Sequence, residues 1–119
     1  MRILIADDSR VERWQVRRIV ESAGHEVVHE SPNGLDALEH IRRLQPDVAI
    51  LDVVMPQMTG DQVLLELANE PHPALVVGSK NSQASLKEIV DAVGATLCVK
   101  PYHPQRLLAS IEAAHGKRR

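Results

Sequence analysis

The chain of 119 residues has 14 Lys and Arg against 16 Asp and Glu, which gives a formal net charge of -2 at pH 7. This length fits one domain with a real hydrophobic core, and the near-neutral charge argues against direct nucleic-acid binding, which usually needs a basic protein. No apolar run approaches the roughly 20 residues of a membrane span, and we expect no signal segment at Met1. One cysteine, Cys98, cannot form an intrachain disulfide, so we expect a reducing, cytoplasmic setting.

Short aliphatic runs alternate with amphipathic stretches along the chain. After the first run, Ser9 is a suitable N-cap for a helix, and Gly24 is a suitable residue to end it. Val16, Ile19 and Val20 then share one helix face. In chain order, the predicted strand and helix pairs are residues 2–6 and 9–24, 25–30 and 35–44, 48–51 and 61–69, 74–77 and 83–93, and 97–99 and 104–114.

Five strand–helix pairs with short connections predict an α/β fold of the flavodoxin-like, doubly wound (βα)5 type. Its sheet has five parallel strands in the order 2-1-3-4-5. The continuously apolar third strand is typical of a parallel sheet that is covered on both faces. Ligands of such sheets bind beyond the carboxyl ends of the strands where the strand order reverses, which is here between strands 1 and 3.

Polar residues follow the predicted strands at that edge. Asp7 and Asp8 follow strand 1, Asp52 follows strand 3, Ser79 follows strand 4 and Lys100 follows strand 5. Two carboxylates ~4 Å apart repel by roughly 4 kcal/mol at an effective dielectric constant near 20, so the cluster favours a bound cation, above all Mg²⁺. The lysine ammonium and the serine hydroxyl suit a phosphoryl group. The pattern therefore predicts phosphoryl transfer to a carboxylate nucleophile.

Three motifs resemble the receiver domain of two-component response regulators. They are Ala-Asp-Asp-Ser at residues 6–9, Leu-Asp-Val-Val-Met-Pro at 51–56 with Gly60 following, and Val-Lys-Pro-Tyr at 99–102. Each motif alone is weak, but the three occur in order and at the right spacing. The resemblance covers residue 2 to about residue 114. We expect residues 1–119 to form one receiver domain, with 116–119 as a tail or the start of a linker.

The resemblance implies roles for individual residues. Asp52 would accept a phosphoryl group from a histidine kinase or a histidine phosphotransfer protein, and Lys100 would contact the phosphoryl oxygens. Asp8, Asp52 and the backbone carbonyl of Val54 would hold Mg²⁺, with Asp7 contributing partly through water. The Lys100–Pro101 peptide bond is expected to be cis. The domain would not be an enzyme with its own substrate; it would assist only its own phosphorylation and dephosphorylation.

Two positions depart from the family pattern. The family places Thr or Ser at the end of strand 4, where counting from Lys100 leads to Gly78 and counting from residues 93–95 leads to Ser79. We favour Ser79, because glycine has no side-chain donor, and both interpretations stay open. The aromatic residue usual in strand 5 is also absent from the neighbourhood of Leu97 and Cys98. Switching is therefore expected to involve movement of the loop at residues 78–83.

Several alternatives and partners follow from the same residues. A degenerate receiver would bind a partner without phosphorylation, and an aspartyl-phosphate hydrolase would need a substrate lid that the chain lacks. A nucleotide-binding module fails because no glycine-rich loop follows strand 1. An output domain or a downstream protein is expected as a partner, homodimerisation stays open, and no membrane association is expected.

Several histidines and arginines outside this edge are expected to lie on the surface. His25 and His29 fall on a strand, where a separation of four does not bring two side chains together as it would on a helix. The arginines of the first helix are interpreted as a solvated face or, as in the family, a docking face for the kinase: Arg10, Arg13, Arg17 and Arg18. For Trp14, exposure and packing against the sheet edge are equally compatible with the pattern.

Overall fold

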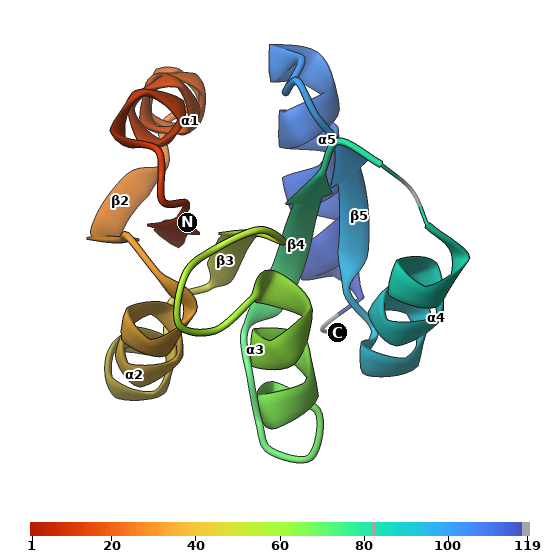
Figure 1. The fold of residues 1–119 in the computed structure, drawn as a ribbon. Coiled ribbons are helices and arrows are strands. Elements are labelled where there is room, and N and C mark those ends of the chain that lie inside the picture. The colour runs from red at the N-terminus through yellow and green to blue at the C-terminus, as the bar shows by residue number, and fades with distance from the viewer. Residues whose placement is uncertain (82, 118–119) are drawn as a thin grey trace.

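The computed structural model describes residues 1–81 and 83–117. Five parallel strands form one sheet in the order β2-β1-β3-β4-β5, which confirms the predicted fold class and strand order. Figure 1 shows α1 and α5 on one face of this sheet and α2, α3 and α4 on the other. The elements are β1 (Arg2–Ala6), α1 (Arg10–Ser22), β2 (Glu26–Ser31), α2 (Gly34–Leu44), β3 (Val48–Asp52), α3 (Gly60–Leu67), β4 (Ala74–Ser79), α4 (Ala84–Val93), β5 (Thr96–Val99) and α5 (Pro104–Gly116).

The alternation of side chains along each strand divides the core into two layers. In β1, Ile3 and Ile5 pack under α1 and α5, whereas Leu4 and Ala6 pack under α2, α3 and α4. All four are at most 2% exposed. Both layers consist almost entirely of aliphatic side chains. Burial of this kind, at about 25 cal/mol per Å² of apolar surface, is what holds the helices against the sheet.

The inner strands are longer than their apolar runs predict. β3 continues to Asp52 and β4 continues to Ser79, two residues beyond the predicted end at residue 77. The backbone ladder explains the extension, since Asp52 pairs with Gly78 and Ser79 pairs with Val99. The polar residues at the edge of the sheet are therefore held by regular strand geometry.

The end of the chain also differs from the expected boundary. α5 continues to Gly116, two residues beyond the predicted end. Lys117 follows it, and its ammonium donates a hydrogen bond to the carbonyl of Ala95 at 2.7 Å. The other two residues of the expected tail, 118 and 119, lie outside the described residues, as does residue 82 of the loop expected to move.

A register shift interrupts the pairing of β1 with β2. Ile3 pairs with Val27, but Leu4 pairs with His29, so Val28 is an extra residue at a β-bulge. Paired residues of parallel strands point to the same face. The bulge therefore turns His29 toward the face covered by α2, the face on which Leu4 lies. Among the described residues, no helix is long and apolar enough to cross a membrane.

Candidate functional site

Three carboxylates converge at the carboxyl ends of β1 and β3. Asp7 and Asp8 follow β1, and Asp52 is the last residue of the neighbouring β3. One oxygen from each side chain lies within 4.8 Å of the others. Asp7 is buried, Asp52 is half-buried and Asp8 is exposed. With Ser79 and Lys100, Asp8 and Asp52 line a cavity of about 300 Å³.

Lys100, the residue after β5, joins this cluster with a side chain that is only 3% exposed. Its Nζ lies 2.8 Å from Asp7 Oδ2, 2.8 Å from Glu12 Oε1 and 3.2 Å from Asp52 Oδ1. Burial alone would lower the pKa of Lys100, but its hydrogen bonds to Asp7 and Glu12 hold that pKa above the usual value. The lysine is therefore charged at neutral pH, and the peptide bond from it to Pro101 is cis, as expected.

The site does not fully compensate its own negative charge. Burial raises the pKa of Asp52, and although Lys100 opposes this, the charges of Asp7 and Glu12 raise it further, so the pKa lies above its usual value. A raised carboxyl pKa means that ionising Asp52 costs folding free energy, and the cost is present above that pKa. A hard cation with oxygen ligands would relieve this repulsion. The carboxylate set therefore fits Mg²⁺.

Gly78, not Ser79, lies beside Asp52 across the ladder between β3 and β4. A side chain at position 78 would point to the same face of the sheet as Asp52. Ser79 points to the opposite face. Although it borders the cavity, its hydroxyl donates to the carbonyl of Asn81 at 2.6 Å and accepts from the Asn81 amide at 3.2 Å. Ser79 as a donor to a phosphoryl group thus stays a prediction.

Comparison with known proteins identifies the family to which this chain belongs. The family model for the response regulator receiver domain matches residues 3–112. The chain belongs to the response regulator receiver family. It is 33% identical over 112 residues to the chemotaxis protein CheY of Thermotoga maritima, and the match covers 92% of this chain and 93% of that protein.

Other relatives show how widely this receiver domain is used. The transcriptional regulatory protein PdtaR of Mycobacterium tuberculosis is 33% identical over 114 residues, which cover 95% of this chain and 56% of that protein. Among solved structures, the NarL signal receiver domain of the same organism superposes with a TM-score of 0.87 at 29% identity, covering 97% of this chain and 96% of that one. Receiver domains of this type are phosphorylation-based switches in two-component signalling.

The space beside Gly78 in this receiver domain is filled by Tyr102. A Cβ built on Gly78 would overlap the Tyr102 hydroxyl and would lie 2.9 Å from the Tyr102 Cε1. The Lys100 ammonium lies 5.3 Å from the centre of the same ring, and burial raises the pKa of the Tyr102 hydroxyl. An aromatic ring from the Lys-Pro-Tyr motif thus occupies the volume that a side chain at position 78 would need.

We expect Gly78→Ala to lower the free energy of unfolding by about 1–3 kcal/mol, because the new methyl group must displace the Tyr102 ring. In a Tyr102→Ala background the same substitution should cost little. A double-mutant cycle followed by urea denaturation measures this coupling. Additive effects of the two substitutions would contradict the overlap.

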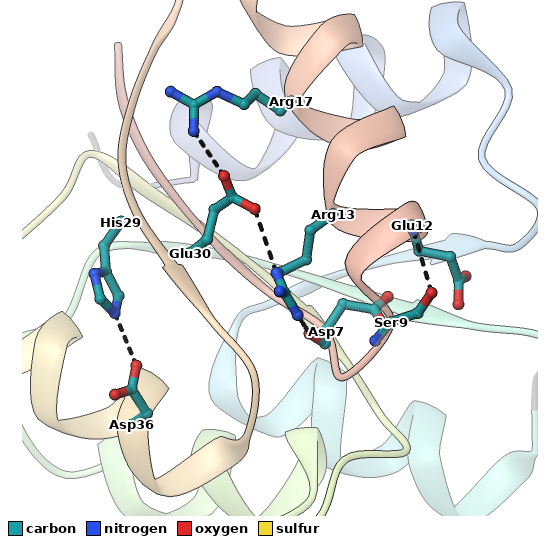
Figure 2. Close-up of polar contacts among 8 residues, drawn as sticks. All are labelled: Asp7, Ser9, Glu12, Arg13, Arg17, His29, Glu30 and Asp36. Atoms are coloured by element: carbon teal, nitrogen blue, oxygen red, sulfur yellow. Dashed lines mark hydrogen bonds and ion pairs between the residues drawn. The ribbon is translucent and has the colours of Figure 1, made fainter.

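The sequence interpretation missed Glu12 as a residue of the site. Glu12 lies in the first turn of α1, where its backbone amide donates to the Ser9 side chain at 3.2 Å (Figure 2). Its carboxylate accepts a hydrogen bond from Lys100 at 2.8 Å. The predicted N-cap at Ser9 could have located it. The third residue after an N-cap lies on the first turn, and here that turn faces the end of β1. Glu12 adds a fourth carboxylate to the cluster and also lines the cavity.

Two expectations about surface residues are corrected by the structure. Arg13 is not part of a freely solvated face, since its side chain is 15% exposed, donates to the carbonyl of Asp7 at 2.6 Å and pairs with Glu30 (Figure 2). His25 and His29 are partly buried instead of ordinary surface residues. His25 contacts the terminal amino group of Met1 at 3.0 Å.

Proposed function

We propose that this chain is a phosphoryl-accepting switch in which Asp52 takes a phosphoryl group from the phosphohistidine of a histidine kinase or a phosphotransfer protein. One observation carries the proposal. The carboxylate of Asp52 lies at the edge of a cavity, with oxygens of two further aspartates within 4.8 Å and the buried ammonium of Lys100 at 3.2 Å. Few reactions other than phosphoryl transfer use a carboxylate nucleophile, a cation site and a fixed positive charge together.

The proposed step is a single displacement at phosphorus. An oxygen of Asp52 forms the new O–P bond while the P–N bond to the donor imidazole breaks, and the electron pair stays on that nitrogen. The product is an acyl phosphate on Asp52. Lys100 moves its ammonium from Asp52 Oδ1 to the phosphoryl oxygens and compensates their charge. No proton has to leave Asp52, because the carboxylate that attacks is ionised.

Mg²⁺ would be held by Asp8, Asp52 and the backbone carbonyl of Val54, with Asp7 contributing through water. When bound, the ion neutralises charge on the phosphoryl oxygens. Asp8 is exposed at the cavity, and the residue Val54 is 73% exposed beside it, so both are accessible from solvent. Asp7 is committed to Lys100 and to the amide of Ser9 at 2.9 Å, which suits a less direct part in holding the ion.

We also propose that the whole chain forms a single receiver domain. Its output would pass to a downstream protein or a linked output domain, and phosphorylation could also favour a homodimer. Because Gly78 offers no hydroxyl beside Asp52 and Tyr102 fills the space next to it, a second candidate function is a receiver that binds its partner without phosphorylation.

The proposal is tested by intact-mass spectrometry after incubation with phosphoramidate, with and without Mg²⁺. We expect wild type to gain one phosphoryl group only when Mg²⁺ is present, and Asp52→Asn to gain none. Asp91→Asn, which changes an exposed aspartate on α4, is the matched control and should react like wild type. Modification of Asp52→Asn would reject Asp52 as the acceptor. An unmodified but folded wild type would favour the phosphorylation-independent receiver, and continuous release of phosphate from a small ester would indicate a hydrolase.

A further inference from the structure

A second cluster of metal-binding side chains lies between β2 and α2, apart from the phosphoryl site. It consists of His29 on β2 and of Asp36 and His40 on α2, and one ligand atom from each residue lies within 4.8 Å of the others. Figure 2 shows the imidazole of His29 pointing at the carboxylate of Asp36. The three side chains are only 15–31% exposed. They therefore form a partly enclosed group that the switch function does not use.

The β-bulge in β2 is what brings His29 into this cluster. Without the register shift, Leu4 would pair with Val28, and His29 would pair with Ile5 on the face covered by α1. With the bulge, His29 pairs with Leu4 and turns toward α2. Bulges commonly re-aim a side chain in this way at functional positions.

The helix supplies the other two ligands in a fixed spacing. Asp36 and His40 are four residues apart, so they lie on one face of α2. The Asp36 amide donates to the side chain of Asn33, which caps the helix, at 2.8 Å, and this fixes the residue in the first turn. Burial alone would raise the pKa of Asp36, but the hydrogen bond with His29 and the nearby histidines hold that pKa below its usual value. The carboxylate is thus ionised.

The distances suit a small ion with nitrogen and oxygen ligands. Asp36 Oδ1 lies 2.8 Å from His29 Nε2 and 3.3 Å from His40 Nδ1. Ligands about 2.0–2.1 Å from a tetrahedral Zn²⁺ are about 3.3 Å from one another. The two imidazole rings stack with centroids 3.7 Å apart, which holds their nitrogens side by side. Binding would require small ring rotations and would replace the bond between His40 Nδ1 and the carbonyl of Asp36.

We propose that His29, Asp36 and His40 form a transition-metal site, best suited to Zn²⁺, with its remaining coordination positions open to water. Imidazole nitrogens select Zn²⁺ and its neighbours over Mg²⁺, whereas the all-carboxylate cluster at Asp52 selects Mg²⁺. The two sites thus differ in ligand chemistry and lie on different parts of the domain. The Zn²⁺ site would join β2 to the first turns of α2.

The test is calorimetric titration of the full chain with ZnCl₂ in saturating MgCl₂, which occupies the carboxylate cluster. We expect one Zn²⁺ per chain, a Zn²⁺-dependent rise in melting temperature, and at least a tenfold loss of affinity in His29→Gln and in His40→Gln. His103→Gln, which changes an exposed histidine before α5, should bind like wild type.

Further measurements keep the outcome unambiguous. Asp52→Asn should bind Zn²⁺ with unchanged affinity, and both histidine variants should retain the wild-type circular dichroism spectrum. Should one variant fail to fold, Co²⁺ absorption of wild type, with the visible bands of a tetrahedral site, supplies the same information. The proposal is overturned if Zn²⁺ affinity is unchanged in both histidine variants, if it is lost in Asp52→Asn, or if Co²⁺ shows no tetrahedral bands.

Discussion

Lys100→Met should lower the free energy of unfolding at pH 7 by about 3–5 kcal/mol in the absence of divalent cations. The substitution keeps the length of the side chain but removes the cation that contacts Asp7, Glu12 and Asp52 within 3.2 Å. The carboxylates are then left without their compensating charge in a partly buried site. Phosphorylation of Asp52 should also become much slower, because no fixed ammonium meets the phosphoryl oxygens.

The loss of stability in Lys100→Met should depend on pH in a defined direction. Without the lysine, which opposes the upward shift, the pKa of Asp52 rises further in the folded state, so the penalty is complete above the raised value. It should disappear below about pH 4, where the carboxyl groups are protonated in both the folded and the unfolded chain. Urea denaturation curves recorded at intervals of about one pH unit between pH 3 and pH 8 measure how the loss of stability depends on pH.

Lys87→Met is the matched control for this substitution. Lys87 is exposed on α4, so its replacement should change stability little at any pH. Added Mg²⁺ should restore part of the stability of Lys100→Met and have no such effect on the control. A Lys100→Met variant as stable as wild type at pH 7 without Mg²⁺ would contradict the charge balance described above.

Gly60→Ala should destabilise the domain by about 1–3 kcal/mol and also slow phosphorylation. A Cβ at position 60 would overlap the backbone carbonyl oxygen of Asp52 and lie 3.0 Å from the Cα of Val53. The Gly60 amide also donates to the carbonyl of Val53 at 2.8 Å, which fastens the start of α3 to the end of β3. The clash is with backbone, which cannot rotate away, so the phosphoacceptor itself must shift.

Gly116→Ala provides the comparison for Gly60→Ala. Gly116 is the last residue of α5, and a Cβ there meets no atom within 4 Å. Alanine is also favoured over glycine in a helix, by roughly 1 kcal/mol in a helix interior, so this variant should be neutral or slightly more stable. Thermal denaturation together with the rate of phosphoramidate labelling distinguishes the two glycines. Equal melting temperatures for both variants would mean that the backbone around Gly60 accommodates the new methyl group without loss of stability.

The order of the strands and the convergence of the aspartates could be predicted because both follow from short-range patterns. Apolar runs of three or four residues mark four of the five strands, and the common doubly wound order then places the ends of strands 1 and 3 side by side. Asp7 and Asp52 directly follow such runs, so their place at one edge of the sheet needs no knowledge of side-chain packing. The same reasoning placed Ser9 as the cap of the first helix.

The features that could not be predicted depend on contacts between distant parts of the chain. Nothing local indicates that Tyr102 fills the space beside Gly78, since this depends on how β5 lies against β4. Likewise, the bulge that turns His29 toward α2 arises from the pairing of two strands more than 20 residues apart. Glu12 is intermediate: its position on the first turn was predictable, but its ion pair with Lys100 was not.

The exposed tryptophan of α1 gives the protein an optical probe of its own. Trp14 is the chain's single tryptophan, is 55% exposed and has the guanidinium of Arg18 at 5.0 Å from its ring. Its indole is not among the groups that line the acidic cavity. Ion binding in that cavity should therefore leave the emission spectrum nearly unchanged. A protein that docks on α1 would shield the indole and shift its emission to shorter wavelength, so fluorescence can follow complex formation separately from the chemistry at Asp52.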